Sequence, residues 1–166
     1  MDNIILIGMP ASGKSTVGVI LAKVLKYKFI DTDLVMQNNT NQMLTEIIEQ
    51  RGMQGFLDFE NDTVSMVDAC HTVIATGGSV VYGEKAMKHL KSIGTVVYLK
   101  HRYEVINSRL TNISTRGVAM KNNQTLHDLF NERIPLYEKY ADITIDADGL
   151  TTEQTVEKIA EIFNKA

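Results

Sequence analysis

The stretch from Gly8 to Ser15 constrains this 166-residue chain more than any other, because it reads Gly-Met-Pro-Ala-Ser-Gly-Lys-Ser. This is the pattern G-x-x-x-x-G-K-S, a glycine-rich turn whose backbone N–H groups cradle phosphates. Residues 4–7, which precede it, are an apolar run that indicates a buried strand, and residues 16–25 carry apolar side chains at helical spacing. The motif therefore stands in the strand, turn and helix context that it requires.

The motif gives a role to individual side chains. The ammonium of Lys14 reaches the β- and γ-phosphates, and the hydroxyl of Ser15 ligates Mg²⁺. The positive end of the helix dipole adds to the attraction for phosphate. A chance glycine turn before an ordinary helix is the competing interpretation, and the four fixed positions in the right context disfavour it. We therefore predict that the chain binds a nucleoside triphosphate.

Length and composition narrow the class of protein. The chain is expected to form one domain, residues 1–166, and its net charge of −3 comes from interspersed acids and bases, so no basic field for nucleic acid is expected. The one cysteine, Cys70, excludes an internal disulfide and is expected to be a small buried apolar residue. The chain opens directly into an apolar strand, and no run reaches membrane-spanning length. A cytoplasmic monomer that contacts neither membrane nor nucleic acid is expected.

Apolar runs alternate with helical segments along the chain. This alternation predicts βα units and a parallel sheet that helices cover on both faces. Near the end, Thr151 and Gln154 fit a capping box, which is followed by an apolar helical stripe that includes Val156 and Ile159. The predicted strands are residues 4–7, 29–30, 72–75, 95–99 and 143–145.

Two segments interrupt this alternation. Residues 40–69 are predicted to be a helical insertion, with Leu44 on its apolar face and Gly52 ending its first part. Residues 112–124 are polar and aperiodic and contain Arg116, so they are predicted to be a lid over an active site. A variable surface loop is the alternative for this segment. A new helix is expected to begin near Thr125.

Two carboxylates follow the second predicted strand. Asp31 and Asp33 are two residues apart, so in extended chain their side chains point the same way, beyond the carboxyl end of the strand. Ligands bind at that edge of open α/β sheets. Asp31 is expected to hold metal or its waters, and Asp33 to orient or deprotonate a substrate hydroxyl. In the alternative, Asp33 only caps a helix that starts at Leu34.

A glycine pair and three arginines complete the candidate site. Gly77 and Gly78 follow the third strand, where backbone N–H groups can approach a ligand closely, although a plain tight turn would look the same. Arg109, Arg116 and Arg133 are candidates to neutralise phosphate or clamp a carboxylate. Taken singly, each arginine also fits a solvated surface charge.

The order of these motifs resembles the shikimate kinase family over nearly the whole chain. The phosphate loop is followed by Asp-Thr-Asp, Thr-Gly-Gly, a lid arginine and Glu-Arg-x-Pro-Leu-Tyr. The resemblance implies an α/β fold of the P-loop nucleoside-monophosphate-kinase type, with a five-stranded parallel sheet sandwiched by helices. It also implies an acceptor-binding subdomain over residues 32–69 and a lid over residues 112–124. The implied activity is ATP-dependent transfer of the γ-phosphoryl group to a hydroxyl of a small metabolite, with Mg²⁺ as cofactor, in aromatic amino acid biosynthesis.

Carried over by position, the resemblance implies a role for each matching residue. The residues that would bind ATP are Gly8, Ala11, Ser12, Gly13, Lys14, Ser15, Thr16, Arg109 against the adenine, and Arg116 from the lid. The metal would meet Ser15 and Asp31. The acceptor site would include Asp33, Leu57, Gly77, Gly78, Ser79 and Arg133, the last clamping a carboxylate. Lys14, Asp33 and Arg116 would be catalytic.

Three departures from the family pattern concern the acceptor. The family's Phe-Arg-x-x-Glu reads here Phe56-Leu-Asp-Phe-Glu60, so Leu57 stands where an arginine would pair with the shikimate carboxylate. Ser79 replaces a third glycine, and the lid's Arg-Pro-Leu-Leu becomes Arg-Gly-Val-Ala over residues 116–119. Losing one charged partner of a carboxylate costs about 1.5–3 kcal/mol, or roughly one to two decades in affinity.

Several functions therefore stay open at this point. Shikimate is the leading acceptor, and an amino alcohol or hydroxy amino acid is the alternative, because Glu60 without its arginine could attract an ammonium group. A different class is a non-catalytic ATP-binding module whose nucleotide state controls a partner. A nucleotide or nucleic-acid kinase of the same fold is the third alternative, which the small acceptor segment disfavours.

Overall fold

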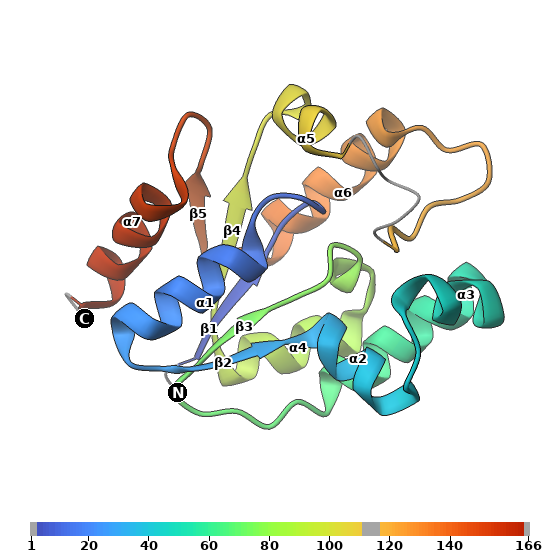
Figure 1. Ribbon diagram of the computed structural model, residues 1–166, viewed down its shortest axis with the longest axis horizontal. Helices are drawn as coiled ribbons and strands as arrows, with labels where there is room; N and C mark the ends of the chain where they lie inside the picture. The colour runs from blue at the N-terminus through green and yellow to red at the C-terminus, as the bar shows by residue number, and fades with distance from the viewer. Residues whose placement is uncertain (1–2, 111–116, 165–166) are drawn as a thin grey trace.

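A five-stranded parallel sheet lies at the centre of the computed structural model, which describes residues 3–110 and 117–164 (Figure 1). The strand order is β2-β3-β1-β4-β5, and every neighbouring pair runs parallel. The predicted parallel sheet is confirmed, and each predicted run lies within a strand. The strands are β1 Asn3–Ile7, β2 Lys28–Asp31, β3 Thr72–Ala75, β4 Gly94–Lys100 and β5 Ile143–Asp146.

Helices cover both faces of this sheet, as the nearly continuous apolar strands predict. Successive residues of β1 enter two different cores: Ile5 and Ile7 pack with α4, α5 and α6, whereas Ile4 and Leu6 pack with α1 and α7. The helices of the described residues are α1 Lys14–Leu25, α2 Thr32–Thr40, α3 Leu44–Ser65, α4 Glu84–Ile93, α5 Tyr103–Arg109, α6 Leu126–Tyr140 and α7 Thr152–Asn164, with a short 3₁₀ turn, η1, at Val80–Tyr82.

Helix α3 lies within the predicted helical insertion, residues 40–69, whereas α2 precedes that range; the two helices pack together and project beyond one edge of the sheet (Figure 1). Gly52 ends the first part of α3, as expected, because its φ of 68° and ψ of 174° break the helical path. Helices α2 and α3 share a small core of their own, in which Met36, Ile47 and Phe56 are buried together with Ala119, a residue much later in the sequence.

The helix caps also follow the sequence. Thr125 and Asp128 exchange hydrogen bonds at the start of α6, which forms the helix expected near Thr125. Thr151 and Gln154 do the same before α7. These reciprocal bonds satisfy N–H groups that the first turn of a helix leaves without partners.

One expectation about burial is wrong. Cys70 is exposed, not buried, and its Sγ lies 3.3 Å from Nδ1 of its neighbour His71. The residue lies in the bend between α3 and β3, at the amino edge of the sheet, where the chain turns on the surface before entering the core. Cys70 therefore does not pack into the core, although its residue type is often buried.

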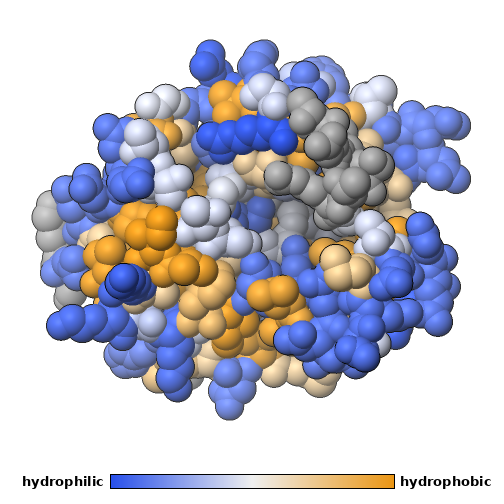
Figure 2. All heavy atoms as spheres, viewed as in Figure 1, coloured by the Kyte–Doolittle hydropathy of each residue, from blue (hydrophilic) through white to orange (hydrophobic). Residues whose placement is uncertain are grey.

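The visible surface is largely polar, with apolar patches over α1 and around β2 and the start of α2 (Figure 2). The exposed large apolar side chains there include Val19, Val24 and Leu34. Within the part of the chain that the structure describes, no helix combines the length and apolarity needed to traverse a bilayer.

The seating of α1 on the sheet generates a testable prediction. A Cβ on Gly18 would lie 2.7 Å from Cε2 of Phe29 on β2, so Gly18→Ala should overpack this contact and lower the free energy of unfolding by about 1–3 kcal/mol. Gly55→Ala on α3 is the matched control, because the nearest atom there is Cβ of Arg51, a residue on the same helix. It should be neutral or stabilising by up to about 1 kcal/mol. Urea unfolding of both variants measures the difference, and equal effects would contradict the close packing of α1.

Candidate active site

The phosphate loop joins β1 to α1 through backbone conformations that suit glycine. Gly8 has a φ of 149° and Gly13 a φ of 90°, and a Cβ on Gly8 would lie 2.8 Å from the carbonyl oxygen of Leu99. Gly13 is the N-cap of α1, and neither a capping side chain nor an acidic residue occupies the first turn. The first N–H groups of α1 are thus left to an anion, which the helix dipole also favours.

The ammonium group of Lys14 is buried inside this loop. Its Nζ donates hydrogen bonds to the carbonyl oxygens of Gly8 and Met9, both at 2.8 Å, and lies 3.3 Å from Oγ of Ser12. Burial lowers the pKa of Lys14 to about 8, although the carboxylate of Asp33 opposes that shift. The loop therefore holds a cation at its centre, ready to meet an anionic ligand.

Ser15 and Asp31 form an oxygen pair next to the loop. The hydroxyl of Ser15 donates to Oδ2 of Asp31 at 2.6 Å, and Oδ1 of Asp31 accepts from the backbone N–H of Asp33 at 3.0 Å. A hydroxyl and one carboxylate on neighbouring elements are the donor set of a Mg²⁺ ion that keeps most of its waters and takes its other ligands from phosphate. These two residues thus fit the metal that the motif implies.

The geometry of the two aspartates differs from the expected one. Helix α2 begins at Thr32, so Asp33 lies in a helical turn and not in extended chain, and the residue that caps the helix is Asp31. Asp31 belongs to both structures because its two oxygens divide between the cap and Ser15. The two side chains nevertheless lie at the same edge of the sheet, as expected.

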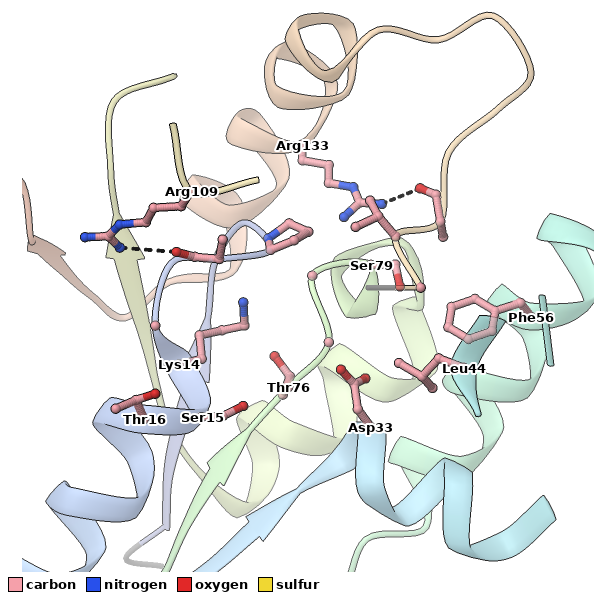
Figure 3. Close-up of a pocket in the computed structure, with 18 residues that line it drawn as sticks. Lys14, Ser15, Thr16, Asp33, Leu44, Phe56, Thr76, Ser79, Arg109 and Arg133 are labelled. Atoms are coloured by element: carbon pink, nitrogen blue, oxygen red, sulfur yellow. Dashed lines mark hydrogen bonds between the residues drawn. The ribbon is translucent and has the colours of Figure 1, made fainter. Parts of the chain in front are cut away.

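Asp33 lines a cavity of about 540 Å³ at the carboxyl ends of the strands. Burial raises the pKa of Asp33 to about 6, the neighbouring charge of Asp31 adds to this, and Lys14 opposes it. Figure 3 shows Asp33 and Lys14 pointing into the cavity from opposite sides, with Leu44 and Phe56 forming an apolar wall. A carboxylate and an ammonium thus face a space large enough for a phosphate group and a small metabolite.

The glycine pair after β3 is a requirement of close packing and not only of a turn. A Cβ on Gly77 would lie 2.6 Å from Oε1 of Glu60 and 2.8 Å from Oδ1 of Asp33. A Cβ on Gly78 would lie 2.7 Å from Cδ of Pro10 and 3.0 Å from Nη1 of Arg133. Any side chain at these positions would displace the charged groups that surround the cavity.

Glu60 is buried behind this glycine pair. The hydroxyl of Ser79 donates to its Oε2 at 2.5 Å, so Glu60 has a hydrogen-bond partner although residue 57 is a leucine. Its other oxygen, Oε1, has no hydrogen-bond partner among the described residues. Burial raises the pKa of Glu60 to about 7, a shift that the bond from Ser79 partly opposes.

Arg133 closes the other end of the cavity from α6 and is only 1% exposed. Its Nη2 donates to the carbonyl oxygen of Ala119 at 2.8 Å, and its guanidinium carbon lies 5.3 Å from the ring centroid of Tyr82. Nε has no hydrogen-bond partner among the described residues. Tyr137, one turn further along α6, donates to the carbonyl oxygen of Gly78 at 2.6 Å.

The structure brings most of the predicted residues together. Those that line the cavity are Ala11, Gly13, Lys14, Ser15, Thr16, Asp33, Gly77, Gly78, Ser79, Arg109 and Arg133. Gly8, Ser12 and Asp31 do not line the cavity but contact residues that do. The carbonyl of Gly8 and the hydroxyl of Ser12 lie next to Nζ of Lys14, and Asp31 is bonded to Ser15. Leu57 does not line it and packs, half-buried, against the small core of the insertion. Arg116 lies outside the described residues.

Arg109 and the apolar wall add details that sequence reasoning did not provide. Nη1 of Arg109 donates to the carbonyl oxygen of Ala11 at 3.2 Å, so this arginine contacts the phosphate loop directly. Leu44, Phe56, Val118 and Ala119 line the cavity but were not among the predicted site residues. The signal for Phe56 was present in its position next to Leu57, and the signal for Val118 and Ala119 was their departure from the lid sequence of the family pattern.

Comparison with known proteins agrees with this geometry. Residues 10–164 match the family model described as shikimate kinase. The chain belongs to the shikimate kinase family. A shikimate kinase from Thermodesulfovibrio yellowstonii is 37% identical over 99% of this chain and 96% of its own length. The structure of shikimate kinase from Acinetobacter baumannii in complex with shikimate has a TM-score of 0.90 at 30% identity, covering 99% of this chain and 94% of that one. The structure of the Aquifex aeolicus enzyme has a TM-score of 0.81 at 31% identity, covering 98% and 96%.

Membership of the shikimate kinase family decides between the functional classes. The protein is an enzyme, an ATP-dependent kinase of the shikimate kinase type that transfers a phosphoryl group to a hydroxyl, the chemistry of aromatic amino acid biosynthesis. This excludes the non-catalytic nucleotide-binding module. The expected P-loop nucleoside-monophosphate-kinase fold is likewise confirmed.

The buried Glu60 predicts an unusual dependence of stability on pH. Its pKa is about 7 in the folded protein against the ordinary value of 4.5 in the unfolded chain, so folding favours the protonated form. Its contribution to stability is therefore greatest below about pH 4.5 and declines as the pH rises to about 7. Glu60→Gln removes this loss, and should stabilise the protein at pH 8 relative to pH 5 by as much as about 3 kcal/mol.

Thermal or urea unfolding of both proteins at the two pH values measures this difference. Glu49→Gln, an exposed carboxylate on the same helix, is the matched control for the loss of one acid. A Glu60→Gln variant that is instead less stable at pH 8 would show that the ionised carboxylate is needed as a counter-charge to Arg133.

Proposed function

We propose that shikimate is the acceptor of this kinase, in spite of Leu57. The observation that carries the proposal is the cavity itself, into which Lys14 and Asp33 point from opposite sides and which the buried guanidinium of Arg133 also lines (Figure 3). Shikimate is a ring that carries one carboxylate and three hydroxyls. An acceptor of this kind offers its carboxylate to Arg133 and a hydroxyl to Asp33, which supports the assignment.

The proposed chemistry follows from the charges around the cavity. Asp33 accepts the proton of the attacking hydroxyl or orients it, and the nucleotide is held by the backbone N–H groups of residues 11–16 and by Lys14. As ATP binds, the ammonium of Lys14 exchanges its bonds to loop carbonyls for bonds to phosphate oxygens. A Mg²⁺ ion at Ser15 and Asp31 would supply positive charge to the phosphates. Arg116 is proposed to add a further cation from the lid.

Arg133 is proposed to bind the acceptor carboxylate without help from a second arginine. Among the described residues that line the acceptor end of the cavity, it alone carries a guanidinium, because Arg109 contacts the phosphate loop. A Cβ on Gly78 would lie 3.0 Å from Nη1 of Arg133, whose Nε has no hydrogen-bond partner among the described residues. Residues 32–69 would then be the acceptor-binding subdomain through Asp33, Leu44 and Phe56, and residues 112–124 the lid.

The position of Glu60 does not favour an acceptor that carries an ammonium group. Glu60 is 2% exposed, is not one of the residues that line the cavity, and has a raised pKa. Its attraction for a cation in the cavity is therefore weak. An amino alcohol or hydroxy amino acid would also place its positive charge near Arg133.

The acceptor assignment predicts how Arg133 and the substrate carboxylate depend on each other. Arg133→Lys loses a planar, two-pronged donor, so the KM for shikimate should rise about 10-fold while the KM for ATP stays within twofold. The methyl ester of shikimate, which lacks the charge, should be a poorer substrate of the natural protein by a similar factor. It should lose little further in the variant. Coupled assay of ADP release measures all four combinations.

Leu57→Arg provides the opposite change. Leu57 itself does not line the cavity, but the longer arginine side chain that the family pattern carries extends further. With its guanidinium at the acceptor carboxylate, the variant should lower the KM for shikimate by up to about 10-fold and leave that of the methyl ester unchanged. If shikimate were not phosphorylated by the natural protein, or if ester and acid were equally good substrates, the acceptor would be a different hydroxyl compound.

The perturbed pKa values of Asp33 and Lys14 predict a bell-shaped pH dependence of kcat/KM, a quantity that reports the ionisation of groups in the free enzyme. The acid limb should lie near pH 6, where Asp33 becomes protonated and can no longer accept a proton. The alkaline limb should lie near pH 8, where Lys14 loses its charge. Asp33→Asn should lower kcat by about 100-fold or more, spare the binding of Mg·ADP, and abolish the acid limb of the residual activity. An acid limb that persists in this variant would assign it to another group.

A further inference from the structure

His101 connects the phosphate loop to a distant part of the fold. It follows the last residue of β4 directly and is 6% exposed. Its Nε2 lies 3.1 Å from the carbonyl oxygen of Ser12 in the phosphate loop, and its Nδ1 lies 3.3 Å from Oδ1 of Asp148, in the connection between β5 and α7. None of the motifs that identify the site includes this histidine.

The contact with Ser12 has a defined direction, because a carbonyl oxygen only accepts hydrogen bonds. Nε2 of His101 is therefore the donor. In a trans peptide, the carbonyl of one residue and the N–H of the next point in opposite directions. No peptide bond of the described residues is cis, so the bond that holds the Ser12 carbonyl against His101 directs the N–H of Gly13 to the other side. Gly13 lines the cavity at the N-terminus of α1.

On the other side of the ring, Nδ1 faces the carboxylate of Asp148, which also only accepts, so the ring donates to both partners when both of its nitrogens carry a proton. This carboxylate also accepts from the backbone N–H of Arg102 at 3.1 Å and from Nε of Arg102 at 2.8 Å, so it is itself held in place. The neighbouring loop carbonyl, of Ala11, accepts from Arg109. Two successive peptides of the phosphate loop are thus gripped by side chains of the same β4–α5 segment.

We propose that His101 is a positioning residue for the nucleotide. It holds the Ser12–Gly13 peptide in the orientation that presents the N–H of Gly13 to a phosphate oxygen, and Asp148 holds the ring that does so. Without this bond the peptide is free to rotate, and the N–H is lost from the set that cradles the phosphates. The inference rests on the proposed function only in that the ligand is an adenine nucleotide, and it does not depend on the identity of the acceptor.

A pair of variants separates the two sides of the ring. The amide nitrogen of glutamine can occupy the place of Nε2, whereas that of asparagine corresponds to Nδ1. His101→Asn should therefore lose the bond to Ser12 and weaken the binding of Mg·ADP about 3- to 10-fold, while His101→Gln stays within about twofold of the natural protein. In both variants the KM for the acceptor should be unchanged, since the acceptor end of the cavity is not involved.

Calorimetric titration with Mg·ADP and steady-state kinetics with ATP measure these effects. His127→Gln, an exposed histidine on α6, is the control and should bind as the natural protein does. Circular dichroism melting establishes that each variant is folded. Equal affinities of the Asn and Gln variants, whether both unchanged or both weak, would overturn the proposal, as would a matching rise in the KM for the acceptor. Failure of the natural protein to phosphorylate shikimate, with Mg·ADP still bound, would overturn only the assigned acceptor.

Discussion

The buried ammonium of Lys14 is the charge around which the site is organised. Removing a cation from water is costly unless polar partners replace the lost hydration. Here two loop carbonyls accept hydrogen bonds from Nζ, and Asp33 offsets its charge from across the cavity. The glycines at both ends of the loop permit this arrangement, because their backbone conformations turn carbonyl groups toward Nζ and N–H groups toward the ligand. The depressed pKa of Lys14 is the residual cost of that burial, which a bound phosphate would reverse.

The framework around this charge could be predicted because it depends on local patterns. The five apolar runs, the capping box of Thr151 and the break at Gly52 each require only a few neighbouring residues, and the structure contains all three features. The position of Asp33 at the phosphate edge was correct for a different reason from the one expected, since a helical turn replaces the extended chain. The prediction that Cys70 is buried was wrong because residue type alone does not reveal which side of a bend faces solvent.

The acceptor end could not be predicted in the same way, because its contacts join residues far apart in the chain. Ser79 departs from the family pattern whereas Glu60 matches it, and only the fold shows that the hydroxyl of one is bonded to the carboxylate of the other. The contact between His101 and Ser12, at the phosphate loop, also joins separate parts of the chain, because the two residues are 89 positions apart. Family membership decides the class of reaction, whereas these chain-specific contacts decide how the common framework is adjusted.

The bond from Arg133 to the carbonyl oxygen of Ala119 has a consequence for the order of events during turnover. One guanidinium both binds the chain at Ala119, within the segment predicted to be a lid, and lines the space where an acceptor would rest. If binding of an acceptor changes the free energy of the contact between Arg133 and residues 117–119, linkage requires that this contact changes the affinity for the acceptor by the same factor.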